Sequence, residues 1–255
     1  MHHRSAFSLI EIAIVLVILG LLVGGVIAGR NLIEAAEIRN TAQSIEKFST
    51  AMYTFSEKYR ALPGDMRNAT TFWGNAINGA MNGDCTDSNL DIGTGTQTCN
   101  GNNNRMFDLT SERFRFWQHL SNSGIIGGNY LGARVTTVAT GRETGVNIPE
   151  VAIAPGGITV TNDADAEKFP NARNINLFQI GNFSNDWPDL ELFTTEQALL
   201  IDRKLDDGRP GVGDVTSSLS TAPNTPNCTT TDVADTSEYD LTEEGVKCFL
   251  VFDIN

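Results

Sequence analysis

The amino-acid sequence predicts an α+β fold, in which one long N-terminal helix packs against a head built on a mostly antiparallel sheet. Three observations lead to this expectation. An uninterrupted apolar run extends from Ile12 to Gly29. A helical stripe of apolar residues follows and continues to Tyr59. Beyond Pro63, short strand-like runs alternate with turn residues.

Length and composition allow one globular head in addition to the helix. The chain has 255 residues, 40% of them hydrophobic, which is enough for a core and excludes wholesale disorder. It carries 31 Asp and Glu against 18 Lys and Arg, a formal net charge of −13. Because phosphate backbones are bound by clustered cations, we expect no nucleic-acid partner. Charge alone also gives little attraction to anionic lipid, so any membrane interaction must come from apolar length.

The apolar run is long enough to cross a membrane. Residues 12–29 contain no charged or strongly polar side chain. As a helix, this run spans about 27 Å, close to the thickness of the hydrocarbon core of a bilayer. Its β-branched residues do not argue against a helix, because in lipid the backbone must satisfy its own hydrogen bonds.

The helix is expected to continue beyond this run as an amphipathic segment. From Arg30 to Tyr59 the chain contains no Gly and no Pro. Apolar residues recur three or four positions apart, the spacing of one helical face. They are Ile38, Ala42, Ile45, Phe48, Met52, Phe55 and Tyr59. Pro63-Gly64 ends the pattern, so we predict one helix from Phe7 to Tyr59, about 80 Å long.

The head is expected to contain two helices and five strands. The first helix is predicted at Ser111–Asn122, with Gly124 as its stop. The second is predicted at Thr195–Leu205, with a capping box formed by Thr194 and Gln197. The strands are predicted at Arg134–Ala139, Val151–Ala154, Ile158–Thr161, Ile175–Phe183 and Cys248–Ile254.

Four cysteines in an exported head suggest disulfide bonds. Three pairings are possible, and we favour Cys85–Cys99 and Cys228–Cys248 because each closes a short loop. The first pair falls in the polar, turn-rich stretch 78–104. A loop of this size contributes about 3 kcal/mol in the chain-entropy model. The alternative is a zinc site made by all four cysteines, but their spacings are too wide for C-x-x-C pairs.

An Asp- and Gly-rich loop after the second head helix is a candidate cation site. Asp202, Asp206, Asp207 and Asp214 could surround a hard cation such as Ca²⁺, with backbone oxygens completing the shell. In the other interpretation, the loop caps the helix, and its acids are solvated or paired with nearby Arg and Lys. A second, weaker cluster lacks the Gly and the distal Glu of an EF-hand; it comprises Asp84, Asp87, Asn89 and Asp91.

The sequence contains no recognisable catalytic set, and we predict that the protein is not an enzyme. GxSxG, phosphate-loop and HExxH patterns are absent. His119 is the one histidine outside the first three residues, and we expect it on a helix as a surface or core side chain. Arg113 and Arg115 lie beside aromatic residues, where the expected arrangement is an amphipathic helix with a solvated basic face.

Glu11 distinguishes the interpretations of the N-terminus. A secretory signal peptide, with Arg4 as its charged start, fits badly because its apolar core is shorter and carries no acid at its entrance. A plain signal anchor would leave Glu11 at the edge of the bilayer or deeper. An unpaired acid there costs up to about 2.5–3.5 kcal/mol. An interpretation that gives Glu11 a partner is therefore preferred.

The residues that precede the apolar run supply such an interpretation. They read Ala6-Phe7-Ser8-Leu9-Ile10-Glu11. This segment resembles the prepilin leader of type IV pilins and type II secretion pseudopilins, with Ala6 where Gly is commonest and Ser8 where Thr is commonest. The resemblance covers about the first thirty residues. It implies cleavage between Ala6 and Phe7 by prepilin peptidase and N-methylation of the new Phe7 amine.

The resemblance also implies a role for Glu11. In that family, the glutamate at this position pairs with the N-terminal amine of a neighbouring subunit. The physics agrees, because a carboxylate in hydrocarbon needs a cation and an adjacent α-ammonium provides one. The resemblance further implies a pilin-like fold. Major pseudopilins carry a structural Ca²⁺ in a C-terminal loop, but the Asp-rich loop here does not align with it residue by residue.

The expected function is that of a structural subunit of a type IV pilus or type II secretion pseudopilus. The chain would divide into a leader (1–6), a transmembrane and filament-core half-helix (7–29), an amphipathic half-helix (30–62) and a periplasmic or extracellular head (63–255). The implied partners are other subunits, prepilin peptidase/methyltransferase, an inner-membrane assembly platform and membrane lipid. The expected location is the inner membrane as a single-pass protein, and then a periplasmic or cell-surface filament.

The alternative function is a membrane-tethered binding module, an adhesin-like head that uses the Asp-rich loops on a ligand. It predicts an uncleaved leader and a ligand bound by the head. An exported hydrolase is disfavoured because the catalytic set is missing.

Overall fold

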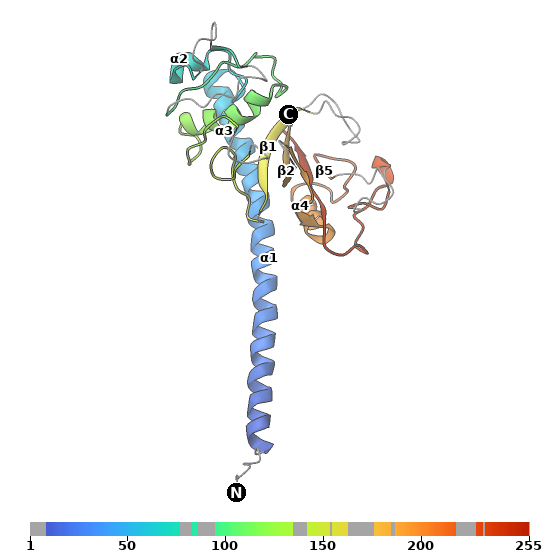
Figure 1. The fold of residues 1–255 in the computed structure, drawn as a ribbon. Helices are drawn as coiled ribbons and strands as arrows, with labels where there is room; N and C mark the ends of the chain where they lie inside the picture. Colours follow the sequence, from blue (N-terminus) through green and yellow to red (C-terminus); the bar gives the residue numbers. More distant parts are fainter. Residues whose placement is uncertain are drawn as a thin grey trace.

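The computed structural model describes residues 9–76, 83–85, 95–134, 142–153, 155–162, 176–184, 187–217, 228–231 and 233–254. It has an α+β, pilin-like architecture, in which a long N-terminal helix carries a head with an antiparallel sheet (Figure 1). The N-terminal half of the helix projects from the head, and the C-terminal half is built into it.

Helix α1 (Leu9–Tyr59) runs unbroken for 51 residues. Its buried residues begin only at Ile38 and follow the predicted stripe. They are Ile38, Thr41, Ala42, Ile45, Phe48, Ala51, Met52 and Phe55. The helix gives way to a left-handed residue at Arg60 (φ 58°), three positions before Pro63. The predicted helix is confirmed from Leu9 to Tyr59, and its first two predicted residues lie outside the described part.

The main sheet is antiparallel throughout. It contains β1 (Gly157–Asn162), β2 (Asn176–Ser184), β7 (Leu250–Asp253) and β5 (Val215–Ser217), in that spatial order. β3 (Trp187–Leu190) pairs with β2 outside this path. A separate two-stranded ladder joins β4 (Phe193–Thr194) to β6 (Val246–Cys248). The C-terminal strand β7 therefore lies inside the sheet, between β2 and β5.

The register of the sheet places one row of apolar side chains on the core side. Val160 lies opposite Phe178, and Phe178 lies opposite Phe252. Because side chains alternate between the two faces of a strand, residues two apart share this face. The row packs into the same core as the buried stripe of α1; its members are Ile158, Val160, Phe178, Ile180, Leu250 and Phe252.

The described part of the head contains three further α-helices: α2 (Ala69–Trp73), α3 (Thr110–Asn122) and α4 (Thr195–Leu205). A short 3-10 turn, η2, covers Ala234–Thr236. The predicted capping box of α4 is present. The Thr194 hydroxyl accepts from the Gln197 amide at 3.1 Å, and the Gln197 side chain accepts from the Thr194 amide at 3.0 Å. At the end of α3, Gly124 has the positive φ (73°) expected of a helix stop.

An aromatic cluster centred on Trp117 joins the layers of the head. The fully buried indole of Trp117 lies 4.9 Å from Phe48 of α1 and 6.1 Å from Phe178 of β2, measured between ring centroids. Phe116, the neighbour of Trp117 on α3, also packs edge-on against the Trp117 ring, at 4.7 Å. Helix α1, helix α3 and the sheet therefore meet at one point.

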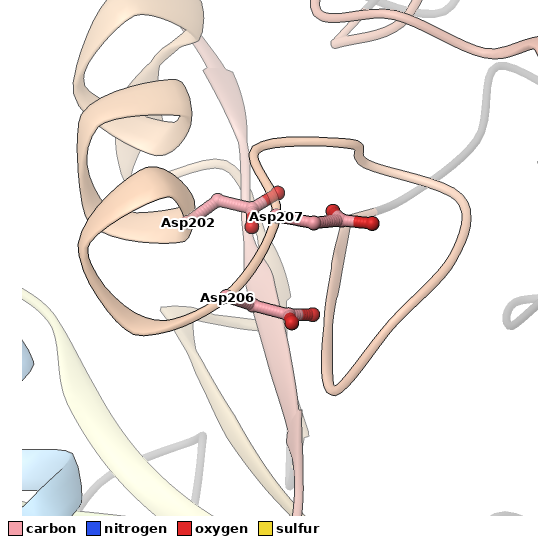
Figure 2. A group of neighbouring side chains, drawn as sticks. All are labelled: Asp202, Asp206 and Asp207. Atoms are coloured by element: carbon pink, nitrogen blue, oxygen red, sulfur yellow. The ribbon is translucent and has the colours of Figure 1, made fainter.

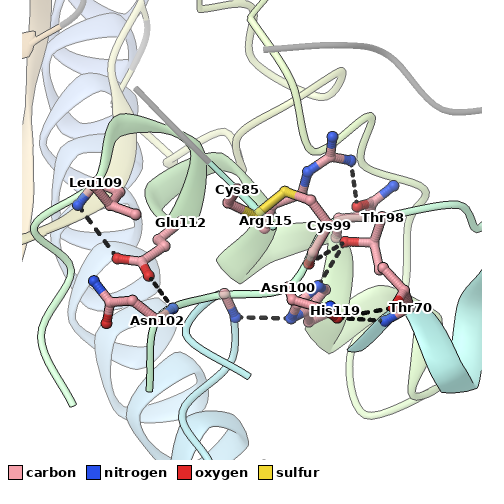
Figure 3. The surroundings of a disulfide bond; sticks show 12 residues. Thr70, Cys85, Thr98, Cys99, Asn100, Asn102, Leu109, Glu112, Arg115 and His119 are labelled. Atoms are coloured by element: carbon pink, nitrogen blue, oxygen red, sulfur yellow. Dashed lines mark hydrogen bonds between the residues drawn. A yellow bond between two sulfur atoms is a disulfide. The ribbon is translucent and has the colours of Figure 1, made fainter. Parts of the chain in front are cut away.

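Both predicted disulfides are present. Cys85–Cys99 spans 14 residues and ties the polar excursion to the loop that precedes α3 (Figure 3). Cys228–Cys248 spans 20 residues and fixes the end of β6 to the segment before η2. No free cysteine is present, so the four-cysteine zinc site is excluded.

The predicted strands are confirmed in part. Those at Ile158–Thr161 and Ile175–Phe183 correspond to β1 and β2. The one at Cys248–Ile254 is divided, because Cys248 pairs with β4 and Leu250 begins the pairing with β2. The strand predicted at Arg134–Ala139 lies, apart from its first residue, outside the described part and stays a prediction.

The strand predicted at Val151–Ala154 is wrong for its described residues. Val151 and Ile153 are buried, but in a turn closed by a hydrogen bond from Gly156 N–H to the Ile153 carbonyl (3.1 Å). A short apolar run is the signal of a buried turn as much as of a strand, so sequence spacing does not separate the two.

Candidate functional site

The N-terminal half of α1 is apolar and uncovered. Every residue from Leu9 to Ala36 is exposed. By length and composition α1 is able to cross a membrane, and its most apolar 18-residue window has no buried residue. Isolated exposed apolar residues are ordinary, but a continuous apolar cylinder in water is not. This half of the helix is therefore compatible with an environment of lipid or of other helices.

Glu11 is the one acid in the first turn of α1 and is exposed on its surface. It lies one residue before the apolar run, in the first turn of α1, and Figure 1 shows this end of α1 farthest from the head. The predicted processing residues Ala6 and Phe7 lie outside the described residues. The geometry therefore places Glu11 on the exposed surface of the first turn of α1, where a neighbouring helix could reach it.

The glycines of this half-helix have no packing role within the chain. A Cβ built on any of Gly20, Gly24, Gly25 or Gly29 would meet no other atom within 4 Å, apart from the helix's own nearby backbone and chain neighbours. They form two pairs with a spacing of four, so each pair lies on one helical face. Glycine in a helix interior costs about 0.5–1 kcal/mol relative to alanine. Nothing inside the described head offsets that cost.

The Asp-rich loop after α4 brings three of its four predicted carboxylates together. Ligand oxygens of Asp202, Asp206 and Asp207 lie within 4.8 Å of one another (Figure 2). Asp202 comes from the last turn of α4, and the other two follow directly after the helix. The Asp214 carboxylate does not belong to this group, so the prediction that it is a fourth ligand is not supported. Its backbone N–H instead donates to Asp206 Oδ2.

Each of the three carboxylates already accepts hydrogen bonds from the loop. Asp202 Oδ1 accepts from Gly208 N–H, and Asp207 Oδ1 accepts from Arg209 N–H (2.9 and 2.8 Å). Asp206 Oδ2 accepts from Val215 N–H at 3.1 Å, as well as from Asp214. The carboxylates therefore cap the loop, as the capping interpretation of the sequence predicts.

Asp202 is the buried member of the group. Its side chain is fully buried, and Tyr239 O–H donates to its Oδ2 at 2.9 Å. Burial raises the pKa of Asp202 to about 6, and the neighbouring charges of Asp207 and Asp206 add to this, against the lowering effect of the hydrogen bonds from Tyr239 and Gly208. The sequence does not reveal Tyr239 as a partner, because it lies 37 residues away and becomes adjacent only through the fold.

The second acidic cluster lies mostly outside the described residues. Asp84 is described, whereas Asp87, Asn89 and Asp91 lie outside the described residues.

The prediction of a solvated basic face on the helix at Ser111–Asn122 is wrong. Arg113 and Arg115 on α3 are buried, with exposed fractions of 8% and 1%. Arg113 donates to the Phe107 carbonyl (3.0 Å), and Arg115 donates to Gln118 Oε1 (2.8 Å). The reason is that α3 is covered on all sides by α1, the sheet and loops, which a helical spacing pattern does not reveal.

His119 has a structural role. It is fully buried, and its Nδ1 accepts from Gly64 N–H at 2.8 Å. The other ring nitrogen must then carry the proton and donate to Thr98 Oγ1 at 2.7 Å. Burial and the nearby Arg115 charge lower the pKa of His119 to about 3, so the ring is neutral at physiological pH. Both ring nitrogens are occupied, which leaves none for a substrate.

The fold and the half-helix define a class of protein: an α+β, pilin-like chain with an exposed apolar N-terminal helix. Comparison with known families assigns the N-terminus. Residues 1–27 match the family model described as the prokaryotic N-terminal methylation motif, the signature of type IV pilins and pseudopilins. No curated protein and no solved structure matches the chain. The assignment therefore rests on the N-terminal segment and on the architecture.

The raised pKa of Asp202 makes stability depend on pH. The folded state holds the proton on the Asp202 carboxyl more tightly than the unfolded chain does. The stability that this proton contributes is therefore fully present below pH 4 and is lost as pH rises through about 6. We expect Asp202→Asn, which keeps an acceptor for Gly208, to gain on the order of 2 kcal/mol relative to the wild type between pH 4 and pH 7. Urea unfolding at a series of pH values measures this. Glu196→Gln, an exposed charge change on the same helix, should show no such gain; an equal gain in both variants contradicts the assignment.

Proposed function

We propose that this chain is a structural subunit of a type IV pilus or type II secretion pseudopilus. The observation that carries the proposal is the exposed apolar half of α1. This half lies within the methylation motif at its N-terminal end and continues, in the same helix, into a half that is built into the head. A surface of this kind is stable in a bilayer before assembly and among equivalent helices after it. The head, residues 63–255, would cover the outside of the filament.

The proposed life of the chain follows from this arrangement. Residues 1–6 are removed by prepilin peptidase, and the new Phe7 amine is methylated. Residues 7–29 first anchor the protein in the inner membrane and then form the filament core, while residues 30–62 connect core and head. An inner-membrane assembly platform and neighbouring subunits are the partners in extraction from the lipid.

The glycine pairs support close packing of these half-helices. Small residues allow helix backbones to approach each other when no water-driven force brings them together. In the isolated chain, nothing occupies the space beside Gly20, Gly24, Gly25 and Gly29. A neighbouring helix that fills this space would account for their cost in helix propensity.

The proposed partner of Glu11 is the methylated Phe7 amine of a neighbouring subunit. The pair neutralises a carboxylate that would otherwise cost about 2.5–3.5 kcal/mol in hydrocarbon. Because the two charges belong to different subunits, the pair also fixes the axial position of one helix relative to the next. We propose no catalytic activity, since the roles assigned to the N-terminal helix are those of assembly.

The first test is mass spectrometry of the intact protein and of its N-terminal peptide, from native membranes with and without prepilin peptidase. We expect a chain that starts at N-methylated Phe7 only when the peptidase is present. A chain that still starts at Met1 in both membranes contradicts the proposal and favours the tethered binding module. A chain cut after the apolar run contradicts it and favours a secreted head.

A second test removes the proposed register charge. Glu11→Ala should reduce incorporation into filaments by at least about tenfold, because the neighbour's ammonium loses its partner. Filaments are sheared from cells and the subunit is quantified by immunoblot. The matched control is Glu57→Ala, an exposed acid at the other end of the same helix. The role of Glu11 is disproved if both variants assemble like the wild type.

We also propose Ca²⁺ as a ligand of the Asp202, Asp206 and Asp207 group. Three carboxylates of one loop within 4.8 Å suit a hard cation that prefers oxygen ligands. Asp207→Asn is the appropriate variant, because an amide oxygen still accepts from Arg209 N–H. Millimolar Ca²⁺ should raise the melting temperature of the wild type by several degrees, and this shift should disappear in Asp207→Asn but persist in Asp214→Asn. No shift in the wild type contradicts the proposal.

A further inference from the structure

A polar pocket lies at the C-terminal end of α1, far from the exposed apolar half of the same helix. It encloses about 270 Å³. Its lining comes from two segments that are distant in sequence: the last turn of α1 with the residues that directly follow it, and the loop before α3. The lining residues are Ser56, Arg60, Ala61, Leu62, Asn103 and Arg105. Figure 1 shows this end of α1 within the head, away from the N-terminus.

The pocket is positive in a strongly negative protein. Two of its described lining residues are arginines and none is an acid, although the chain has a net charge of −13. Among the described residues, neither the Arg60 nor the Arg105 guanidinium takes part in an ion pair or a hydrogen bond. A protein with 31 acidic residues and 18 basic ones has carboxylates available to neutralise both. The two charges are therefore free to face a ligand.

The backbone around the pocket is held in an unfavourable conformation. Arg60, Asn103 and Arg105 have φ values of 58°, 60° and 67°. They are the three non-glycine residues with positive φ in the described part of the chain, and all three line this pocket. A left-handed backbone conformation costs free energy for residues other than Gly and Asn. Residues held in this conformation cluster at functional sites.

A buried carboxylate fixes the loop in this conformation. Asp65 is fully buried; its Oδ1 accepts from Asn103 N–H, and its Oδ2 accepts from Arg105 N–H at 2.7 Å. On the other side, Asn176 Nδ2 donates to the Arg105 carbonyl at 2.8 Å. Both polar groups of the Arg105 backbone are therefore fixed from the core. The Arg105 side chain leaves from a rigid point, so its position needs little ordering when a ligand binds.

Both oxygens of the Asp65 carboxylate are occupied by the loop backbone, so Asp65 does not neutralise the arginines. Both Asp65 oxygens accept backbone N–H groups, and burial raises the pKa of Asp65 despite those bonds. Ser56 also contributes a polar group to the wall of the pocket. Ser56 Oγ is buried and has no hydrogen-bond partner among the described residues. The site therefore combines two free cations, a rigid support and an unsatisfied hydroxyl.

We propose that this pocket binds a small oxyanion, a phosphate or carboxylate group, between the guanidinium groups of Arg60 and Arg105. The planar fork of a guanidinium matches the oxygens of either group through charge-assisted hydrogen bonds. The volume accommodates such a group with part of the molecule that carries it. The site is separate from the filament-core helix and from the Asp-rich loop, so it does not depend on the proposed function.

The test is a titration of the full chain in detergent with two probes, inorganic phosphate and acetate, at constant ionic strength against chloride. We expect saturable one-to-one binding of at least one probe, and the tighter one identifies the class of anion. Arg60→Asn and Arg105→Asn should each weaken binding about tenfold or more, because each removes one charge-assisted contact. Asparagine tolerates the left-handed backbone, so both variants should keep the fold.

The matched control is Arg67→Asn, which removes the same charge from an exposed position outside the pocket and should change affinity less than about twofold. A second readout needs no variant. The bound anion should protect Arg60 and Arg105 from phenylglyoxal, measured by peptide mass spectrometry, while Arg67 stays reactive. The proposal is overturned if neither probe binds saturably, or if all three arginines respond alike in either experiment.

Discussion

The packing of Phe48 and Phe178 against Trp117 is the contact on which the rest of the head depends. Phe48 belongs to α1, Trp117 to α3 and Phe178 to the central strand β2, so one buried indole joins the three layers. Aromatic rings contribute large buried area and prefer edge-to-face geometry, as Phe48 and Trp117 show at 74°. The contact also fixes which face of α1 turns inward. The position of the head on the helix, and hence the length of helix left uncovered, follows from it.

The acids of the head have a structural use that its composition does not suggest. Glu112 accepts from Asn102 and Leu109 N–H groups at 3.0 and 3.2 Å, beside the Cys85–Cys99 disulfide (Figure 3). Asp65 and the Asp202 group cap other loops in the same way. Burial raises the pKa of Glu112 to about 8, against the lowering effect of its two backbone donors. The head has few regular elements, so side-chain carboxylates satisfy backbone donors that a sheet or helix would otherwise pair.

The two halves of α1 meet different environments although they form one helix. Residues from Leu9 to Ala36 are exposed, and burial begins at Ile38, where the apolar residues are confined to one stripe of the helix. A connection between α4 and α1 lies close to this boundary, where Gln197 Nε2 donates to Glu34 Oε1 at 2.9 Å. A rigid helix across the boundary transmits the position of the head to the uncovered half. In the proposed filament, this coupling would let the helical core set the arrangement of the outer surface.

The sequence by itself determined the long helix, its change from apolar to amphipathic, the capping box at Thr194, both disulfides and the methylation motif. Each is local: it depends on spacing along the chain or on short loops, and needs no knowledge of what packs nearby. Tertiary structure decided the rest. It buried the arginines of α3 and left Asp214 out of the carboxylate group. It moved the chain from the two-stranded ladder to the main sheet at Phe249, and it brought Tyr239 to Asp202. It also brought Arg60 and Arg105 to one pocket across 45 residues. The burial and partners of these residues are set by contacts between segments that are distant in sequence. A pattern within one segment carries no information on the energies of those contacts.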